Sequence, residues 1–327
     1  MFICSGLTSF THYRLYSRCF FLLLVILIYA CNGTERGSVQ IREARLLHVK
    51  KLNYPSGSTV NFYKDRLYLM GDDAPDMLIL DTCFVIKKRV PIFSSETQRI
   101  IKRIKPDIEA GDFIQAADGA SLWLFGSGSV KPHRDSLFVY NTSTRQIRRK
   151  DISVLYDQIE QLGAQGLNIE AAALVRQKML LGHRAVALKP NYLISIPYRS
   201  LNLQTATPKL IAVKQPETTA GISGMAYDGV NDRLFLTFST EDTANSYSDG
   251  ETGDSFLALI DNISAKYESD SLSIDAWLPL ASVDASFKKM KIESVAITRY
   301  AAKEYHLILV ADNDDGNTIV YKLWISL

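Results

Sequence analysis

Cysteine is scarce in this chain of 327 residues, and its scarcity excludes a fold held together by disulfide bonds. Two of its four cysteines, Cys4 and Cys19, lie in an N-terminal leader, and a third, Cys31, lies at the end of it. Only Cys83 then remains in the folded region, where we expect a small buried hydrophobic residue in a strand. About 285 residues are enough to bury a core that is held by packing alone.

The chain also lacks an excess of either charge. It contains 37 Lys and Arg residues against 35 Asp and Glu residues, and removal of a leader that holds Arg14 and Arg18 would leave the two signs balanced. A protein without net charge offers no electrostatic reason to bind nucleic acid or an anionic surface. We therefore expect no nucleic-acid partner.

The apolar run Cys19–Tyr29 is too short to cross a bilayer. It is shorter than the roughly 18–20 residues of a spanning helix, and it follows a leader with two arginines and no acid. A basic leader before a short apolar segment is typical of a signal peptide.

The residues that close this run, Ile28-Tyr29-Ala30-Cys31, resemble a bacterial lipoprotein box, in which the cysteine becomes the acylated first residue. We expect residues 1–30 to be a signal peptide, residues 31–40 a lipid-anchored tether and residues 41–327 a single domain. The protein would then lie in the bacterial cell envelope, held to the outer membrane on its periplasmic or surface face. An ordinary cleaved signal and an uncleaved N-terminal anchor are the alternatives.

A repeated strand pattern is what the chain has in abundance. Five segments open with a small or acidic residue, run through an apolar strand, turn, and return through a second apolar strand. The repeats open at Ser58, Glu109, Glu170, Ser223 and Glu293. The second strands are Arg66–Met70, Ser121–Phe125, Lys178–Leu181, Arg233–Phe238 and Tyr305–Val310. Repeats of this size predict stacked units that share a core, here the blades of a β-propeller.

Alternating and β-branched residues locate the outer strands of each repeat. Third strands are expected at Leu78–Asp81, Leu137–Asn141, Tyr192–Pro197, Phe256–Asp261 and Thr318–Ile325, and fourth strands at Val85–Ile92, Gln146–Ser153, Lys209–Lys214 and Ser273–Leu280. The last repeat lacks a fourth strand, whereas the strand expected at Ile41–Leu52 belongs to none of the repeats. We therefore expect an all-β, five-bladed propeller that is closed by this N-terminal strand in the last blade. Six blades are the alternative, and we expect a monomer.

Two helices are predicted between the strands. Ser95-Glu96-Thr97-Gln98 has the spacing of a capping box before Arg99–Ile104, and apolar residues recur at helical spacing from Ile152 to Leu162. Two basic clusters, Lys102-Arg103-Lys105 and Arg145–Lys150, fit either an anion site or a solvated face, and the solvated face is preferred.

Glu109, Glu170 and Glu293 hold equivalent positions in three repeats, so we expect them to converge on the propeller axis at similar height. Carboxylates brought together must bind a cation, pair with Arg or Lys, or acquire a raised pKa. One interpretation is a ligand or metal site, with Ca²⁺ suited to oxygen donors from several loops. The other is structural, each carboxylate joining one blade to the next.

Further candidate ligands flank the strand ends. They are Asp72, Asp73, Arg184, Glu241, Asp242, Asp249, Glu251 and Asp312. We expect the repeat openings and the second-strand ends at opposite ends of their hairpins unless bulges intervene. Acidic residues are also common in tight turns for conformational reasons alone, and a structural salt bridge to Glu170 is the preferred role of Arg184.

Several strings resemble those of an uncharacterised bacterial propeller family. They are Lys105-Pro106-Asp107-Ile108-Glu109, Gly126-Ser127-Gly128-Ser129, Asn168-Ile169-Glu170, Glu241-Asp242-Thr243 followed by Asp249-Gly250-Glu251, and Lys291-Ile292-Glu293. That family is distantly similar to phytase-like or esterase-like propellers. The resemblance covers most of residues 42–325 and implies a propeller fold, with no established activity to transfer.

Two functions follow as hypotheses. The first is a lipid-anchored envelope propeller that binds a small ligand or a protein partner without catalysis. The second is a Ca²⁺-dependent hydrolase of phosphorylated or ester substrates, which the phytase-like resemblance suggests.

Overall fold

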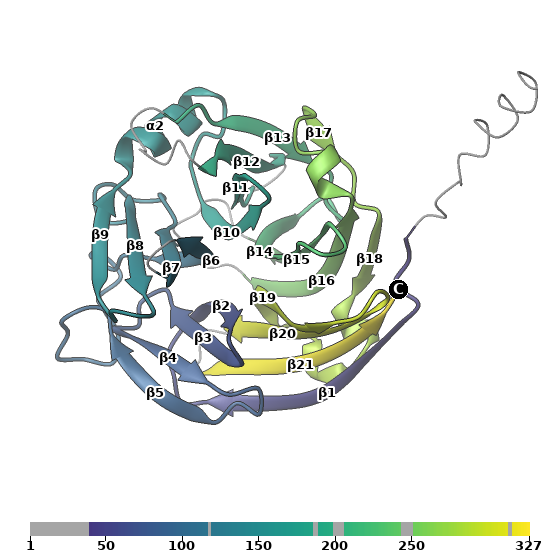
Figure 1. The fold of residues 1–327 in the computed structure, drawn as a ribbon, viewed down its shortest axis with the longest axis horizontal. Coiled ribbons are helices and arrows are strands. Elements are labelled where there is room, and N and C mark those ends of the chain that lie inside the picture. Colours follow the sequence, from purple (N-terminus) through teal and green to yellow (C-terminus); the bar gives the residue numbers. More distant parts are fainter. Residues whose placement is uncertain (1–38, 117–118, 186–188, 199–205, 243–250, 313–315) are drawn as a thin grey trace, which may run out of the picture. The chain divides into compact units, whose positions relative to one another are not determined.

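Five β-sheets surround a central axis and form a five-bladed propeller (Figure 1). The computed structural model describes residues 39–327 apart from residues 117–118, 186–188, 199–205, 243–250 and 313–315. None of the helices in this described part combines the length and the apolar character that a bilayer crossing requires.

The blades follow one another along the chain, each with its first strand nearest the axis. The first blade contains β2 (Gly57–Tyr63), β3 (Arg66–Gly71), β4 (Asp76–Leu80) and β5 (Ile86–Pro91). The second contains β6 (Ile108–Ala116), β7 (Gly119–Gly126), β8 (Ser136–Asn141) and β9 (Ile147–Asp151). The third contains β10 (Ile169–Val175), β11 (Lys178–His183), β12 (Asn191–Pro197), β13 (Lys209–Val213) and the short parallel β17 (Ser271–Leu272). The fourth contains β14 (Ala220–Asp228), β15 (Arg233–Asp242), β16 (Glu251–Asp261) and β18 (Ala276–Pro279).

The fifth blade joins the two ends of the described chain. It contains β19 (Lys291–Tyr300), β20 (Glu304–Asp312), β21 (Thr318–Ser326) and, on its outer edge, β1 (Glu43–Leu52). β1 runs antiparallel to β21, with Glu43 opposite Ser326 and Leu52 opposite Thr318. The structure therefore confirms five blades and their closure by the N-terminal strand.

Hydrophobic packing between neighbouring blades holds the ring together. Five clusters of buried apolar side chains fill the five interfaces, and β19 contacts β2 so that the last interface closes the circle. At that closure the buried Thr318 Oγ1 accepts a hydrogen bond from Gly57 N at 2.9 Å and donates one to the Tyr54 carbonyl at 2.8 Å. Apolar faces on both sides of each blade are thus covered by the next blade.

One of the two predicted helices forms. α2 (Ser153–Gln161) packs Leu155, Tyr156 and Ile159 into the core, as its helical spacing predicts. The predicted helix over Ser95–Ile104 was wrong, because this segment consists of bends and turns.

Local and long-range contacts explain why no helix forms over Ser95–Ile104. Ser95 Oγ bonds to the backbone of Thr97 instead of capping a helix. Arg99 reaches Asp73, and Ile100 N donates to the Asp73 carbonyl at 2.7 Å, so the segment is held against the first blade.

The expectation of a buried Cys83 was also wrong. Cys83 is exposed, since it lies in the turn before β5 and not within a strand. The Asp81 carboxylate accepts hydrogen bonds from the Cys83 and Val85 N–H groups and shapes this turn.

Candidate functional site

A β-bulge lies at the start of every inner strand, and the bulged residue is the one that opens the sequence repeat. In β10, Ile169 lies opposite His183 and Ala171 opposite Gly182, which leaves Glu170 without a partner in the register. The same shift isolates Ser58, Glu109, Ser223 and Glu293. Because bulges re-aim side chains and recur beside functional sites, the five positions form one structurally equivalent ring.

The repeat openings and the second-strand ends lie at the same end of the propeller, which corrects the expectation of opposite ends. In an antiparallel hairpin the first residue of one strand faces the last residue of the next. Ile108 accordingly faces Gly126, and Lys291 faces Asp312. The acidic and basic residues of both segments therefore gather at one end of the axis.

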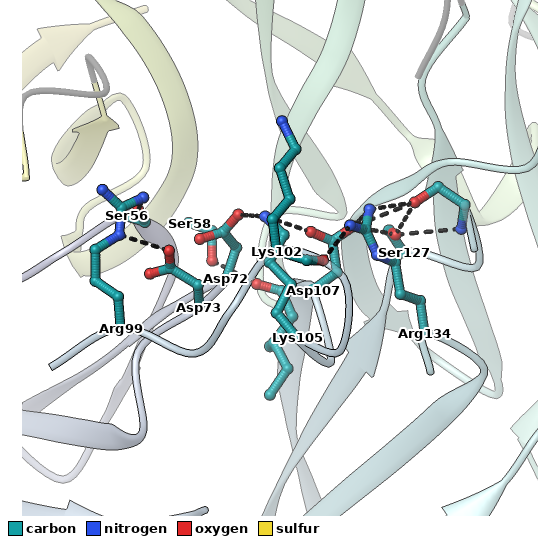
Figure 2. Close-up of polar contacts among 12 residues, drawn as sticks. Ser56, Ser58, Asp72, Asp73, Arg99, Lys102, Lys105, Asp107, Ser127 and Arg134 are labelled. Atoms are coloured by element: carbon teal, nitrogen blue, oxygen red, sulfur yellow. Dashed lines mark hydrogen bonds and ion pairs between the residues drawn. The ribbon is translucent and has the colours of Figure 1, made fainter. Parts of the chain in front are cut away.

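Lys105 and Asp107 join the first and second blades at this end (Figure 2). Lys105 Nζ contacts Asp72 Oδ2 and lies 2.7 Å from Asp107 Oδ1. The second oxygen of Asp107 accepts hydrogen bonds from the buried Arg134 and from Ser127. These cations hold the pKa of Asp107 below its ordinary value despite burial, whereas burial and the neighbouring acids raise the pKa of Asp72 to about 7.

Arg99 forms the outer edge of this group (Figure 2). Its Nε lies 2.6 Å from Asp73 Oδ2, and its Nη2 donates to Ser56 Oγ at 2.9 Å. Burial disfavours the charged guanidinium, but the hydrogen bond to Asp73 and the charges of Asp73, Asp72 and Asp312 outweigh burial and raise the pKa of Arg99. The interaction pins the linker after β5 to the end of the axis.

Arg184 connects the third blade with the fourth. Its Nη1 lies 3.8 Å from Glu170 Oε2 and donates to Ser239 Oγ at 2.8 Å, while its Nη2 lies 3.2 Å from Glu241 Oε2. Gly221 makes room for this side chain, since a Cβ there would lie 2.5 Å from Arg184 Cγ. The preferred interpretation of Arg184 as a partner of Glu170 agrees with this geometry, although Ser239 and Glu241 lie closer.

Lys291 extends the network into the fifth blade. Its Nζ lies 3.0 Å from Glu293 Oε1 and 3.5 Å from Glu241 Oε2. Glu241 thus receives one cation from the third blade and another from the fifth. The surrounding carboxylates raise the pKa of Lys291 and keep it protonated.

Four carboxylates remain incompletely compensated. Asp72 and Asp73 each have a cationic partner at one oxygen, but Oδ1 of each is buried without a hydrogen-bond partner among the described residues. Glu293 Oε2 is buried without a hydrogen-bond partner among the described residues, and burial raises the pKa of Glu293 to about 8. No ion pair or hydrogen bond of the partly buried Glu109 side chain is found within the described part of the chain. Burial, and then the charges of Asp72, Asp107, Glu170 and Glu293, raise the pKa of Glu109 well above its ordinary value.

We call this group the axial cluster. Its carboxylates are Asp72, Asp73, Asp107, Glu109, Glu170, Glu241, Glu293 and Asp312, and its cations are Arg99, Lys105, Arg134, Arg184 and Lys291. Among the described residues these are eight acids and five cations, and the mutual repulsion of the carboxylates adds to burial in raising the pKa of Asp72, Glu109 and Glu293.

Most of the candidate acids named from the sequence belong to the axial cluster, and a few lie beyond what the structure describes. Asp242 and Glu251 face each other across β15 and β16, but their side chains are outside the described part. Asp249 and Cys31 lie outside the described residues altogether.

Sequence reasoning missed five members of the axial cluster as site residues: Arg99, Lys105, Asp107, Arg134 and Lys291. A signal for Lys291 was present, since it precedes Glu293 by two positions at the start of the same strand. Lys105 likewise precedes Asp107 by two positions, but both lie before β6 begins, so strand alternation does not place them together.

One group of three acids has the spacing of a metal site. Single oxygens of Asp72, Asp107 and Glu109 lie within 4.8 Å of one another. Oxygen donors of this kind suit Ca²⁺, which takes six to eight ligands. The Lys105 ammonium already contacts two of the three acids, so the position between Asp72 and Asp107 holds a built-in cation.

Comparisons with known proteins identify a family and several distant structural likenesses. No curated protein sequence is significantly similar to this chain. A glutaminyl cyclase from Myxococcus xanthus shares 8% identity at a TM-score of 0.47, covering 88% of this chain and 99% of its own. A thermostable family-43 glycoside hydrolase shares 9% at 0.48, covering 86% and 91%. A DUF4221 family member from Bacteroides vulgatus shares 7% at 0.35, covering 80% and 75%.

At these identities and TM-scores we transfer nothing from the three structures to this chain. The family comparison is of a different kind, because it matches residues 53–325, which include all five inner strands and every member of the axial cluster. The chain belongs to the family of unknown function DUF6929.

Proposed function

We propose that this protein is a lipid-anchored binding module of the bacterial cell envelope, and that the axial cluster binds a positively charged group of its ligand. The ligand is either a small molecule or an exposed basic group of a protein partner. Propeller loops that converge on the axis are suited to such binding.

The observation that carries the proposal is the incomplete compensation of Glu109 and Glu293. Both open a repeat at a bulge, both have a raised pKa, and Glu293 Oε2 is buried without a partner among the described residues. A buried carboxylate without a partner costs free energy, which a bound cation would recover.

An ammonium or guanidinium group fits this site better than a bare metal ion. Lys105 already contacts Asp72 and Asp107, whereas Glu293 Oε2 is buried without a partner among the described residues and Glu109 has no ion pair there. Ca²⁺ bound by Asp72, Asp107 and Glu109 would have to displace the lysine. We therefore expect organic cations to bind without rearrangement of the cluster.

The path of β1 supports an anchored arrangement. β1 begins at the end of the propeller opposite the axial cluster and reaches the cluster end only at Leu52. A lipid on Cys31 would thus be attached, through residues 31–40, to the end of the domain away from the cluster.

Thermal-shift titrations test the binding proposal. Putrescine, arginine and Ca²⁺ are added separately to the purified domain, and a ligand that binds only the folded state raises Tm in proportion to ln(1 + [L]/Kd). We expect the organic cations to raise Tm in the wild type and not in the Glu109→Gln, Glu293→Gln double variant. Glu304→Gln is the control, since Glu304 is an exposed acid of the fifth blade, the blade that contains Glu293. A wild-type Tm that responds to none of these cations would overturn the proposal.

A second candidate function is Ca²⁺-dependent hydrolysis of a phosphorylated or ester substrate. The supporting observation is the spacing of Asp72, Asp107 and Glu109, with Arg134 beside Asp107. Release of p-nitrophenol from its phosphate or acetate ester, with Ca²⁺ and with chelator, tests it. Hydrolysis that Ca²⁺ stimulates and Glu109→Gln removes would favour this candidate over binding alone.

A further inference from the structure

A concave surface lies between the second blade and the linker that follows β5, which also carries Arg99 and Lys105 of the axial cluster. We call it the linker groove. It has a volume of about 410 Å³, and its lining includes Phe93, Ile101, Ile104, His133, Phe138 and Arg149. This volume lies within the range of small-molecule sites.

Aromatic rings form the apolar part of the linker groove. Phe93 and Phe138 meet edge to face, with their ring centroids 4.9 Å apart. Phe138 belongs to the core between the first and second blades, and Phe93 packs against that core. The apolar base of the groove is therefore supported by the core between the first two blades as well as by the linker.

The linker supplies apolar side chains that remain in contact with solvent. Ile101 is 70% exposed and Ile104 is 42% exposed. Arg99 and Ile100 hold the linker to Asp73, and the linker does not form a helix. The two isoleucines are therefore not buried on the apolar face of a helix. Adjacent exposed apolar side chains beside a concave surface indicate a binding site more than a solvated loop.

The polar part of the linker groove is cationic. Arg149 donates from Nε to Ser136 Oγ at 2.9 Å, and no ion pair of its guanidinium is found in the part of the chain that the structure describes. His133 lies at the same surface, and no carboxylate lines it. Asp151, the next acid on this face of β9, accepts a hydrogen bond from Ser153 N; hydrogen bonding to Ser153 and, to a smaller degree, the Arg149 charge lower the pKa of Asp151, without an ion pair between the two side chains.

We infer that the linker groove binds an amphiphilic anion, a single apolar chain that ends in a carboxylate or phosphate. The apolar tail would lie on Phe93, Ile101 and Ile104. The head group would accept hydrogen bonds from Arg149, whose fork-shaped donors match both groups. This site is separate from the axial cluster, and its ligand has the opposite charge.

Isothermal titration with short amphiphiles below their micellar concentrations tests the inference. Decanoate and decyl phosphate distinguish the two head groups, while decyltrimethylammonium and octyl glucoside carry a cationic and a neutral head. We expect one or both anions to bind, and Arg149→Glu to weaken that binding at least tenfold. Ile104→Ser should weaken it as well.

Matched variants separate specific binding in the groove from nonspecific effects of surface charge and exposed apolar side chains. Arg148 lies on the same strand with its side chain on the opposite face, so Arg148→Glu makes the same change of charge and should alter the affinity less than twofold. Val230→Ser, an exposed apolar residue of the fourth blade, should have no effect. Equal binding of the cationic or neutral amphiphile, an equal loss in Arg148→Glu, or no binding of either anion would each overturn the inference.

Discussion

Lys291 Nζ lies 3.0 Å from Glu293 Oε1, and the other oxygen of that carboxylate is buried without a hydrogen-bond partner among the described residues. The two side chains come from the same inner strand, with one residue between them. A buried carboxylate that is satisfied on one side only prefers to hold a proton, and this preference makes the cluster sensitive to pH.

The first prediction concerns that sensitivity. Burial raises the pKa of Glu293 from 4.5 to about 8. Because the folded state holds this proton more tightly than the unfolded state, Glu293 contributes to the free energy of unfolding. This contribution is fully present below about pH 4.5 and is lost as the pH rises through about 8. Asp72, with a pKa of about 7, acts in the same direction. Thermal unfolding between pH 5 and pH 8 in the absence of added cations measures the effect.

A matched pair of variants assigns the pH dependence. Glu293→Gln cannot ionise, so the difference in Tm between pH 5 and pH 8 should become smaller. Glu304→Gln, in the same blade and exposed, should leave it unchanged. An undiminished pH dependence in Glu293→Gln would contradict the assignment.

Arg184→Met should be among the most destabilising substitutions in the cluster. It leaves the Glu170 and Glu241 carboxylates buried without their shared cation, and removal of one partner of a buried pair costs about 3–5 kcal/mol. Glu170→Gln should cost less, since the amide can still accept from Asn168 Nδ2, which lies 2.6 Å from Glu170 Oε1. Urea unfolding at pH 7 measures both changes. A smaller loss for Arg184→Met than for Glu170→Gln would contradict the bridging role of the arginine.

Lys105→Met should create a response to Ca²⁺. Without the ammonium, the oxygens of Asp72, Asp107 and Glu109 are left within 4.8 Å of one another and need a cation. Ca²⁺ at a hundredfold excess over Kd would stabilise the variant by about 2.7 kcal/mol, seen as a rise in Tm that chelator reverses. Lys102→Met, a change at an exposed lysine nearby, should show no such gain. A folded Lys105→Met protein without this response would show that the three acids do not form a metal site.

Thr318→Val should weaken the closure of the ring. The valine cannot replace the hydrogen bonds to Gly57 N and the Tyr54 carbonyl, and buried groups without partners cost about 1–3 kcal/mol each. Hydrogen exchange should become faster in β1 and β2 than in the second and third blades. Thr142→Val, which removes a hydrogen bond to Ala120 within the second blade, should leave β1 protected.

Cys31→Ser tests the lipid anchor. If Cys31 is the acylated first residue of the mature protein, the variant should leave the membrane fraction or remain unprocessed, and its mass should lack the lipid. Fractionation followed by intact-mass measurement decides the matter. Identical fractionation and identical mass change for wild type and variant would exclude the anchor.

The sequence alone determined the architecture, because the signals for it are local and repeated. Strand alternation has a period of two residues, and each hairpin lies within a short stretch of chain. The five openings therefore predicted five blades, and the unpaired strand at Ile41–Leu52 predicted the closure. The equivalence of Glu109, Glu170 and Glu293 could likewise be seen from their places in the repeat.

Only the tertiary structure decided which charges pair in the axial cluster. Lys105 meets Asp72 across two blades, and Arg184 meets Glu241 across two others, so no local pattern predicts these partners. The same reason explains the lost helix at Ser95–Ile104, where a favourable capping pattern was overridden by the contact of Arg99 with Asp73. Local propensity sets the strands, whereas the ion pairs depend on distances that exist only after the blades have closed into a ring.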